Sequence, residues 1–147
     1  MKHYLLQPEI AGGLGRRTVV ESEARRDTER QEAFVSSFHC ELDGWLGDDL
    51  IESFPCFLVT ETLGSVLAEE HLSGFELADV EVTSSKYYQR IHPGSTLPKF
   101  RWLQITGTPE EDDFWIENDQ SLAVSDQAWK LLSKFQLQHC SVRQEAA

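Results

Sequence analysis

The stretch from Phe54 to Val82 constrains the fold most, because its hydrophobic pattern changes from strand to helix and back to strand. It contains an apolar run at residues 57–59 with strand character, and Thr60 directly after this run is a suitable helix N-cap. The next apolar positions are spaced as on one face of a helix, at Leu63, Val66 and Leu67. Gly74 is a helix stop signal, and the apolar residues after it are interrupted mainly by acids, as in a half-buried strand. The stretch therefore predicts a strand, a helix near residues 61–71 and a second strand.

A similar pattern recurs near the C-terminal end. Residues 124–142 align with residues 59–77 at a constant offset and without a gap, with the N-cap, the helical face and the strand in the same order. We therefore expect a strand–helix–strand unit used twice, with a second helix near residues 126–135 and both helices docked on one sheet. The expected strands lie at 3–7, 18–21, 34–42, 56–59, 75–82, 100–107, 114–117, 122–124 and 138–142. This order predicts an α+β domain with a mainly antiparallel sheet and two principal helices packed on it.

The length of 147 residues fits one domain, residues 1–147. Residues 22–33 are almost entirely polar, which predicts an exposed charged loop or helix. Residues 144–147 are expected to form a frayed tail. Serine, proline and glycine punctuate residues 83–99, which predicts a long excursion with a short helix near 85–91. Long excursions of this kind often serve as binding loops.

The hydropathy of the chain is that of a protein without membrane spans. No apolar run approaches the ~20 residues that a spanning helix needs, and the apolar segment at the N-terminus is too short for a signal peptide. We therefore expect a cytoplasmic protein that makes no membrane contact. The three cysteines have no CxxC spacing, which indicates reduced, buried thiols.

The charge of the chain bears on its partners. The formal net charge is −12, from 25 acidic against 13 basic residues. Nucleic acid and anionic membrane surfaces would be repelled by this charge, so neither is an expected partner. A basic protein is the partner that the charge favours.

No combination of residues points to catalysis, a metal or a cofactor. Two His-Cys pairs, at residues 39–40 and 139–140, resemble metal ligands. Neighbouring side chains on a strand point to opposite faces, so at most one residue of each pair could reach a shared site. The chain contains no Gly-x-Ser-x-Gly elbow, and its acidic doublets fall in turns, where carboxylates are usually solvated. We therefore expect no enzyme activity, no catalytic residues, no metal and no cofactor.

Two groups of aromatic and acidic residues have the composition of an interaction hot spot. The first is a glycine-bounded corner with Trp45, Asp48 and Asp49, and the second is an acidic turn with Trp115 close behind it. The carboxylates of the turn belong to Glu110, Glu111, Asp112 and Asp113. We predict that these eight residues contact a protein partner through its lysines and arginines.

The chain resembles a family of bacterial immunity proteins that are encoded beside polymorphic toxins. The resemblance covers nearly the whole chain except the charged stretch, and it rests on residues 12–15, 43–52, 57–60, 74–77, 100–107 and 112–114. It implies an antidote that binds a cognate toxin domain in the cytoplasm and neutralises it, and it implies no catalytic residues. An acidic antidote fits a nuclease toxin, which must be basic to hold its phosphodiester substrate.

Two alternatives remain open from the sequence. Residues 12–17 include three glycines and two arginines, and such a loop could serve a small ligand-binding domain or enzyme as an anion site. The strand preference of the residues that follow makes a tight turn the favoured interpretation. The other alternative is a homodimer formed through an exposed sheet edge.

Overall fold

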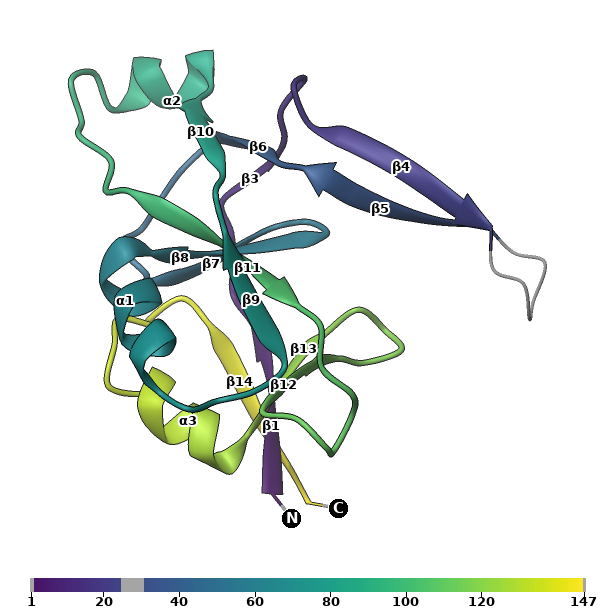
Figure 1. Cartoon of the computed structure of the whole chain (residues 1–147). Helices are drawn as coiled ribbons and strands as arrows, with labels where there is room; N and C mark the ends of the chain where they lie inside the picture. Colours follow the sequence, from purple (N-terminus) through teal and green to yellow (C-terminus); the bar gives the residue numbers. More distant parts are fainter. Residues whose placement is uncertain (1, 25–30, 147) are drawn as a thin grey trace.

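The computed structural model describes residues 2–24 and 31–146. Within these residues the chain forms a mixed α+β structure with mostly antiparallel strand pairs and three helices. Both described chain ends lie at one end of the molecule, and the excursion that carries α2 (Lys86–Ile91) lies at the other end (Figure 1). The α+β class with a mainly antiparallel sheet is confirmed.

A four-stranded antiparallel sheet contains both chain ends, in the order β12-β13-β1-β14. Its strands are β12 (Phe114–Ile116), β13 (Leu122–Ser125), β1 (Lys2–Gln7) and β14 (Ser141–Ala146). Strand β1 is central, because Tyr4 lies opposite Val124 on one side and opposite Gln144 on the other. The expected frayed tail at residues 144–147 is therefore wrong for residues 144–146, whose backbone pairs with β1, and Ala147 lies outside the described residues.

A five-stranded sheet forms the middle of the molecule, in the order β2-β7-β8-β11-β9. Its strands are β2 (Glu9–Ile10), β7 (Leu50–Ser53), β8 (Cys56–Thr60), β11 (Phe100–Ile105) and β9 (Phe75–Ala78). Only the short β2–β7 pair in this sheet is parallel.

Strand β8 is buried at all five positions because both faces of its sheet are covered. Phe57 and Val59 pack into one hydrophobic cluster, which includes Phe114 and the buried side of the helices. Cys56 and Leu58 point the other way, into a second cluster around Phe38 and Trp102. This two-sided burial explains the continuous apolar run in the sequence, where a strand covered on one face would alternate.

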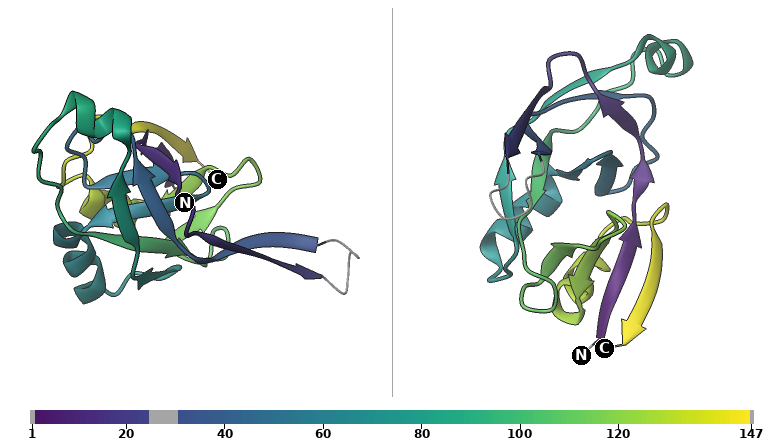
Figure 2. Two further views of the ribbon diagram at one scale, coloured as in Figure 1. Left: turned by 90° about the horizontal axis from the view of Figure 1, so that it is seen from above. Right: turned by 90° about the vertical axis from the view of Figure 1, so that its right-hand side faces the viewer.

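The remaining strands form a three-stranded sheet and a hairpin. The sheet has the order β10-β6-β3, with β10 (Glu81–Ser84) parallel to β6 (His39–Leu42) and β6 antiparallel to β3 (Gly12–Leu14). The hairpin consists of β4 (Val19–Ala24) and β5 (Gln31–Ser37) and projects from the body of the molecule (Figures 1 and 2). The expected strands at 34–42 and 75–82 are thus each divided into two.

The expected charged loop or helix at residues 22–33 is wrong where the structure describes it. Residues 22–24 belong to β4 and residues 31–33 to β5, while residues 25–30 lie outside the described residues. The pairing of Val20 with Val35 lies near the base of the hairpin, where Val35 packs against the second cluster. The polar residues 22–24 and 31–33 form strands because they pair with each other beyond this base. Their amino-acid composition alone does not predict strand structure.

The two principal helices begin where the sequence predicts and end earlier. Helix α1 (Glu61–Glu69) is capped by Thr60, whose hydroxyl accepts a hydrogen bond from the Leu63 N–H. Helix α3 (Asp126–Leu132) is capped in the same way by Ser125, with the Ala128 N–H as donor. The expectation that both helices dock on one sheet is wrong: α1 packs on β8 and β11, whereas α3 packs on β1 and β13.

In the part of the chain that the structure describes, no helix has the length and apolar character that a membrane crossing requires.

Burial of two cysteines predicts a loss of stability at alkaline pH. Burial raises the pKa of the Cys40 thiol to about 11 and that of the Cys56 thiol to about 12. In the unfolded chain both thiols have their ordinary pKa of 9.0, so above this pH the unfolded state binds fewer protons than the folded state. We expect the two thiols together to lower the free energy of unfolding by about 2 kcal/mol between pH 9 and 10.

Urea unfolding at pH 8, 9 and 10 measures this loss. A Cys40→Ala/Cys56→Ala variant is the control, and it should lose about 2 kcal/mol less than the wild type over the same range. Equal losses in the two proteins would contradict the assignment of the effect to these thiols.

Candidate functional site

The acidic turn that the sequence predicts as an interaction site lines a pocket of about 680 Å³. The pocket lies between the start of β1, the loop before β12 and the first turn of α3. Its carboxylates belong to Glu110, Glu111, Asp112, Asp113 and Asp126, and its cationic side chains belong to Lys2 and Lys130. We call this site the acidic pocket. Five carboxylates against two ammonium groups leave it with a negative charge at neutral pH.

Two of the carboxylates hold the turn in shape. Asp113 Oδ1 accepts a hydrogen bond from the Ser125 hydroxyl at 2.6 Å, and its Oδ2 accepts one from the Ser73 N–H at 2.9 Å. Asp112 Oδ2 accepts a hydrogen bond from the Thr108 N–H at 2.7 Å. Asp113 thus connects the turn to the N-cap of α3. Asp112 and Asp113 together hold the backbone of the turn that carries the Glu110 and Glu111 side chains.

The two glutamates of the turn are available to a partner. Glu110 and Glu111 are both exposed, and among the described residues neither side chain has a hydrogen bond or an ion pair. Glu110 adopts the left-handed backbone conformation, with φ of 66°, at the tip of the turn. The tip therefore presents two adjacent carboxylates to solvent at the rim of the acidic pocket.

Asp126 supplies a further carboxylate from the first turn of α3. Its Oδ2 lies 3.2 Å from Lys130 Nζ one turn later, and its Oδ1 accepts a hydrogen bond from the Tyr4 hydroxyl at 3.3 Å. The hydrogen bond from Lys130 holds the pKa of Asp126 below its usual value. Asp126 is thus ionised at neutral pH, and the exposed Lys130 ammonium is a counter-ion that a partner's cation could replace.

Trp115 does not have the predicted role of a contact residue. Its side chain is only 2% exposed, and its Nε1–H donates to Glu117 Oε1 at 3.0 Å. The ring packs against the imidazole of His3, with centroids 5.3 Å apart. Trp115 therefore forms part of the pocket floor, and its packing orients the N-terminal strand beside the acidic turn.

The corner with Trp45, Asp48 and Asp49 is a structural connection, so its predicted role in partner contact is wrong for Asp48 and unsupported for the other two. Asp48 is 1% exposed and accepts hydrogen bonds from the backbone N–H of His139 at 2.9 Å and from its Nδ1–H at 3.0 Å. Asp49 accepts one from the Thr60 hydroxyl at 2.7 Å and one from the Gln136 N–H at 2.9 Å. Both carboxylates thus hold the segment after α3 against the start of α1.

Trp45 belongs to the same connection. Its Nε1–H donates to the backbone oxygen of Asp48 at 2.8 Å, and its half-buried ring packs edge-on against Phe100. The structure therefore divides the eight predicted contact residues. It gathers Glu110, Glu111, Asp112, Asp113 and Trp115 in one pocket and uses the other three to hold loops together.

Removal of the Asp48 carboxylate should destabilise the fold. An Asp48→Ala change leaves the His139 N–H and imidazole without their buried acceptor, so we expect a loss of about 2–3 kcal/mol in the free energy of unfolding. Urea unfolding at pH 7 measures it, with Asp79→Ala at an exposed carboxylate as the control. Equal stability of the two variants would contradict the structural role of Asp48.

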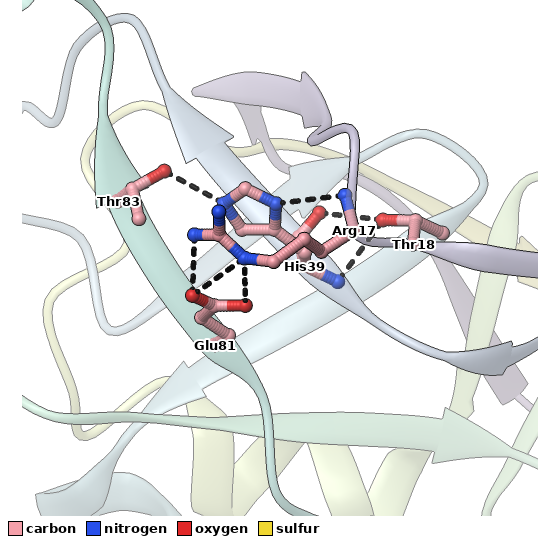
Figure 3. A network of polar contacts seen from close by, with 5 residues as sticks. All are labelled: Arg17, Thr18, His39, Glu81 and Thr83. Carbon is pink, nitrogen blue, oxygen red and sulfur yellow. Dashed lines mark hydrogen bonds and ion pairs between the residues drawn. The ribbon is translucent and has the colours of Figure 1, made fainter.

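The glycine-rich loop does not have the geometry of an anion site. Residues 12–14 form β3, and Gly15 N–H donates to the His39 carbonyl at 2.7 Å. The Arg17 side chain is paired with Glu81, with Nε 2.8 Å from Oε1 (Figure 3). Strand β4 follows the loop, so a phosphate would find no helix N-terminus here, and the Arg17 guanidinium is already paired with Glu81.

His39 holds this loop in place from the buried side. The Arg17 N–H donates to His39 Nδ1 at 3.3 Å, which leaves the ring proton on Nε2, 2.7 Å from Thr83 Oγ1 (Figure 3). The Thr18 hydroxyl donates to the His39 carbonyl at 2.7 Å and lies 3.0 Å from the His39 N–H. Because the fold engages both ring nitrogens of the buried His39, this histidine has a structural role.

Among the described residues no group of three or more His, Cys, Asp and Glu side chains could hold a metal ion.

Sequence reasoning missed the residues that complete the acidic pocket from other segments. These are Lys2, His3, Ser125, Asp126, Gln127 and Lys130. One signal was present, because the predicted N-cap at residue 125 places Asp126 in the first turn of a helix. Its proximity to the acidic turn depends on the pairing of β12 with β13, which no local pattern indicates.

No family model, no curated protein and no solved structure matches this chain.

Proposed function

We propose that this protein is a cytoplasmic immunity protein that binds a cognate basic toxin domain and neutralises it by covering its substrate-binding surface. The observation that carries this proposal is the acidic pocket, which combines two exposed glutamates with the ionised Asp126 on a rigid support. The resemblance of the sequence to immunity proteins points in the same direction.

The acidic pocket suits a lysine or arginine side chain. Glu110 and Glu111 lie at its rim, and Asp126 lies in the first turn of α3. A cation from the partner could displace Lys130 from Asp126 and pair with the rim glutamates at the same time. A guanidinium fits this arrangement best, because it can form two parallel hydrogen bonds with one carboxylate.

The charge of the whole protein supports association with a basic partner. A net charge of −12 attracts a cationic domain over several ångströms and raises the rate of encounter at low salt. A toxin that acts on a polyanion such as nucleic acid presents a cationic surface for its substrate. The same surface would be covered by an acidic inhibitor, which explains neutralisation without any catalytic step.

Co-expression tests the proposal. The proposal expects the gene immediately upstream to encode a large secreted protein, and the C-terminal domain of that protein is the toxin candidate to test. We expect that domain to stop bacterial growth when expressed alone, and we expect growth and a co-purified complex when this protein is expressed with it. A toxic upstream domain that is neither bound nor neutralised would contradict the proposal.

The alternative of an anion-binding loop at residues 12–17 receives no support from the geometry, because Glu81 pairs with Arg17 and β3 uses the loop backbone.

A further inference from the structure

One segment of this acidic protein carries basic residues without any acidic ones. Residues 82–109 contain four basic residues and no Asp or Glu, although the chain as a whole has a net charge of −12. The basic residues are Lys86, Arg90, Lys99 and Arg101. The segment includes α2 and the excursion after it, which lie at the opposite end of the molecule from the chain ends (Figures 1 and 2).

Helix α2 presents apolar and cationic side chains side by side to solvent. Tyr87 is 62% exposed and Ile91 is 53% exposed, and they lie four residues apart on one face of the helix. Lys86 and Arg90 are also exposed and have the same spacing on the adjacent face. We call these four residues the α2 surface.

The α2 surface is held firmly by the body of the protein. Tyr88 on the same helix is buried, and Ser85 caps the helix by accepting a hydrogen bond from the Tyr88 N–H at 3.1 Å. The Ser85 N–H in turn donates to the Leu42 carbonyl at 2.9 Å, which connects the helix to β6. The helix is anchored through Tyr88, and among the described residues neither Tyr87 nor Ile91 belongs to a hydrophobic cluster. Exposed tyrosine and arginine on a rigid support are the residue types that dominate protein interfaces.

We propose that the α2 surface of one molecule docks in the acidic pocket of a second copy of this chain. Charge complementarity identifies the occupant: Lys86 and Arg90 meet the rim carboxylates of Glu110 and Glu111, and Tyr87 and Ile91 are covered by the same contact. The two surfaces lie at opposite ends of the molecule, so the contact is head to tail (Figures 1 and 2). A contact between two different patches generates short chains or rings rather than a two-fold dimer.

This inference goes beyond the proposed function and does not depend on it. The self-association occupies the same pocket that is proposed for the toxin domain, so a toxin domain would separate the assembled molecules. The test below uses only this protein, and therefore its failure leaves the proposed function unaffected.

Sedimentation equilibrium at 20 mM and 500 mM NaCl tests the contact. We expect the average mass of the wild type to rise above 16.8 kDa with concentration at low salt and to return to 16.8 kDa at high salt. The Lys86→Glu/Arg90→Glu variant should remain a monomer at low salt. The control variant Arg16→Glu/Lys134→Glu has the same change of charge at exposed positions outside both surfaces, and it should weaken association less than about twofold.

A mixing experiment separates this contact from other self-association. Lys86→Glu/Arg90→Glu leaves both surfaces negative, and Glu110→Lys/Glu111→Lys leaves both positive, so each variant alone should be a monomer. A mixture of the two should associate again, because every α2 surface then meets a pocket of opposite charge. Circular dichroism of each variant checks that it is folded.

Three results would overturn the proposal. They are a wild type that stays monomeric up to 1 mM at low salt, self-association that survives both charge reversals, and a mixture of the two variants that stays monomeric. Binding of a DNA duplex probe that requires Lys86 and Arg90, without self-association, would assign the α2 surface to an anionic partner of another class and would also overturn it.

Discussion

Replacing Gly107 with valine is expected to lower the free energy of unfolding by about 3 kcal/mol and to distort the acidic turn. A Cβ atom at this position would collide with the backbone oxygen of Phe114, and it would lie 2.8 Å from Asp112 Cβ and 2.9 Å from Gly74 Cα. Two of these neighbours are backbone atoms, so a side-chain rotation cannot relieve the overlap. Gly74 faces the same carbonyl, so three backbone segments approach one another closely at this point.

Urea unfolding of Gly107→Val measures this effect. The matched control is Gly44→Val, because a Cβ at Gly44 would have no heavy atom within 4 Å and its φ is not in the left-handed region. The control should lose less than about 1 kcal/mol. If the two variants lose the same amount, the close approach of residues 74, 107 and 114 does not fix the acidic turn as the structure indicates.

Reversing the charge of Glu110 and Glu111 is expected to weaken binding of the toxin domain by at least about 100-fold and to abolish protection in co-expression. The Glu110→Lys/Glu111→Lys variant places two cations at the rim of the acidic pocket, where the proposal requires a cation from the partner. The fold should be preserved, because both side chains are exposed and Asp112 and Asp113 keep the hydrogen bonds that shape the turn.

The control for this variant is Glu21→Lys/Glu41→Lys, which changes the net charge equally at exposed positions on other strands. It should weaken binding only a few-fold, through the loss of long-range attraction. Isothermal titration with the toxin domain at 150 mM NaCl measures both. Equal weakening by the two variants would show that total charge determines binding and that the acidic pocket has no special part in it.

The sequence predicts those parts of the fold that depend on near neighbours. Thr60 and Ser125 are recognisable as N-caps because the apolar spacing that follows each is helical, and both cap a helix in the structure. The ends of the helices are less predictable: α3 ends at Leu132, and Asp49 accepts a hydrogen bond from the Gln136 N–H in the segment that follows. The apolar run at residues 57–59 indicates a strand, and the structure adds that both its faces are covered.

The roles of the acidic residues could be predicted only in part. Asp48 lies in the glycine-bounded corner and Asp112 in the acidic turn, and nothing local distinguishes a solvated carboxylate from one that accepts hydrogen bonds. The partner of Asp48 is His139, 91 residues away, so its burial depends on tertiary contacts that a local pattern does not contain. The acidic turn could be predicted as a site because four consecutive acidic residues have no basic residue next to them in the sequence. In the structure two of these residues, Glu110 and Glu111, are exposed.

The hairpin of β4 and β5 shows the same limit. Residues 22–24 and 31–33 have a composition typical of loops, and their strand structure depends on pairing with each other. The pairing starts beside Val20 and Val35, where the hairpin meets the second hydrophobic cluster.

Hydrogen–deuterium exchange of this protein, free and in complex with the toxin domain, tests whether the acidic pocket is the binding site. We expect binding to slow exchange in residues 106–115 and 125–130, which surround the acidic pocket, and to leave exchange unchanged in residues 43–49. Protection confined to residues outside the acidic pocket would contradict the claim that this pocket binds the toxin domain.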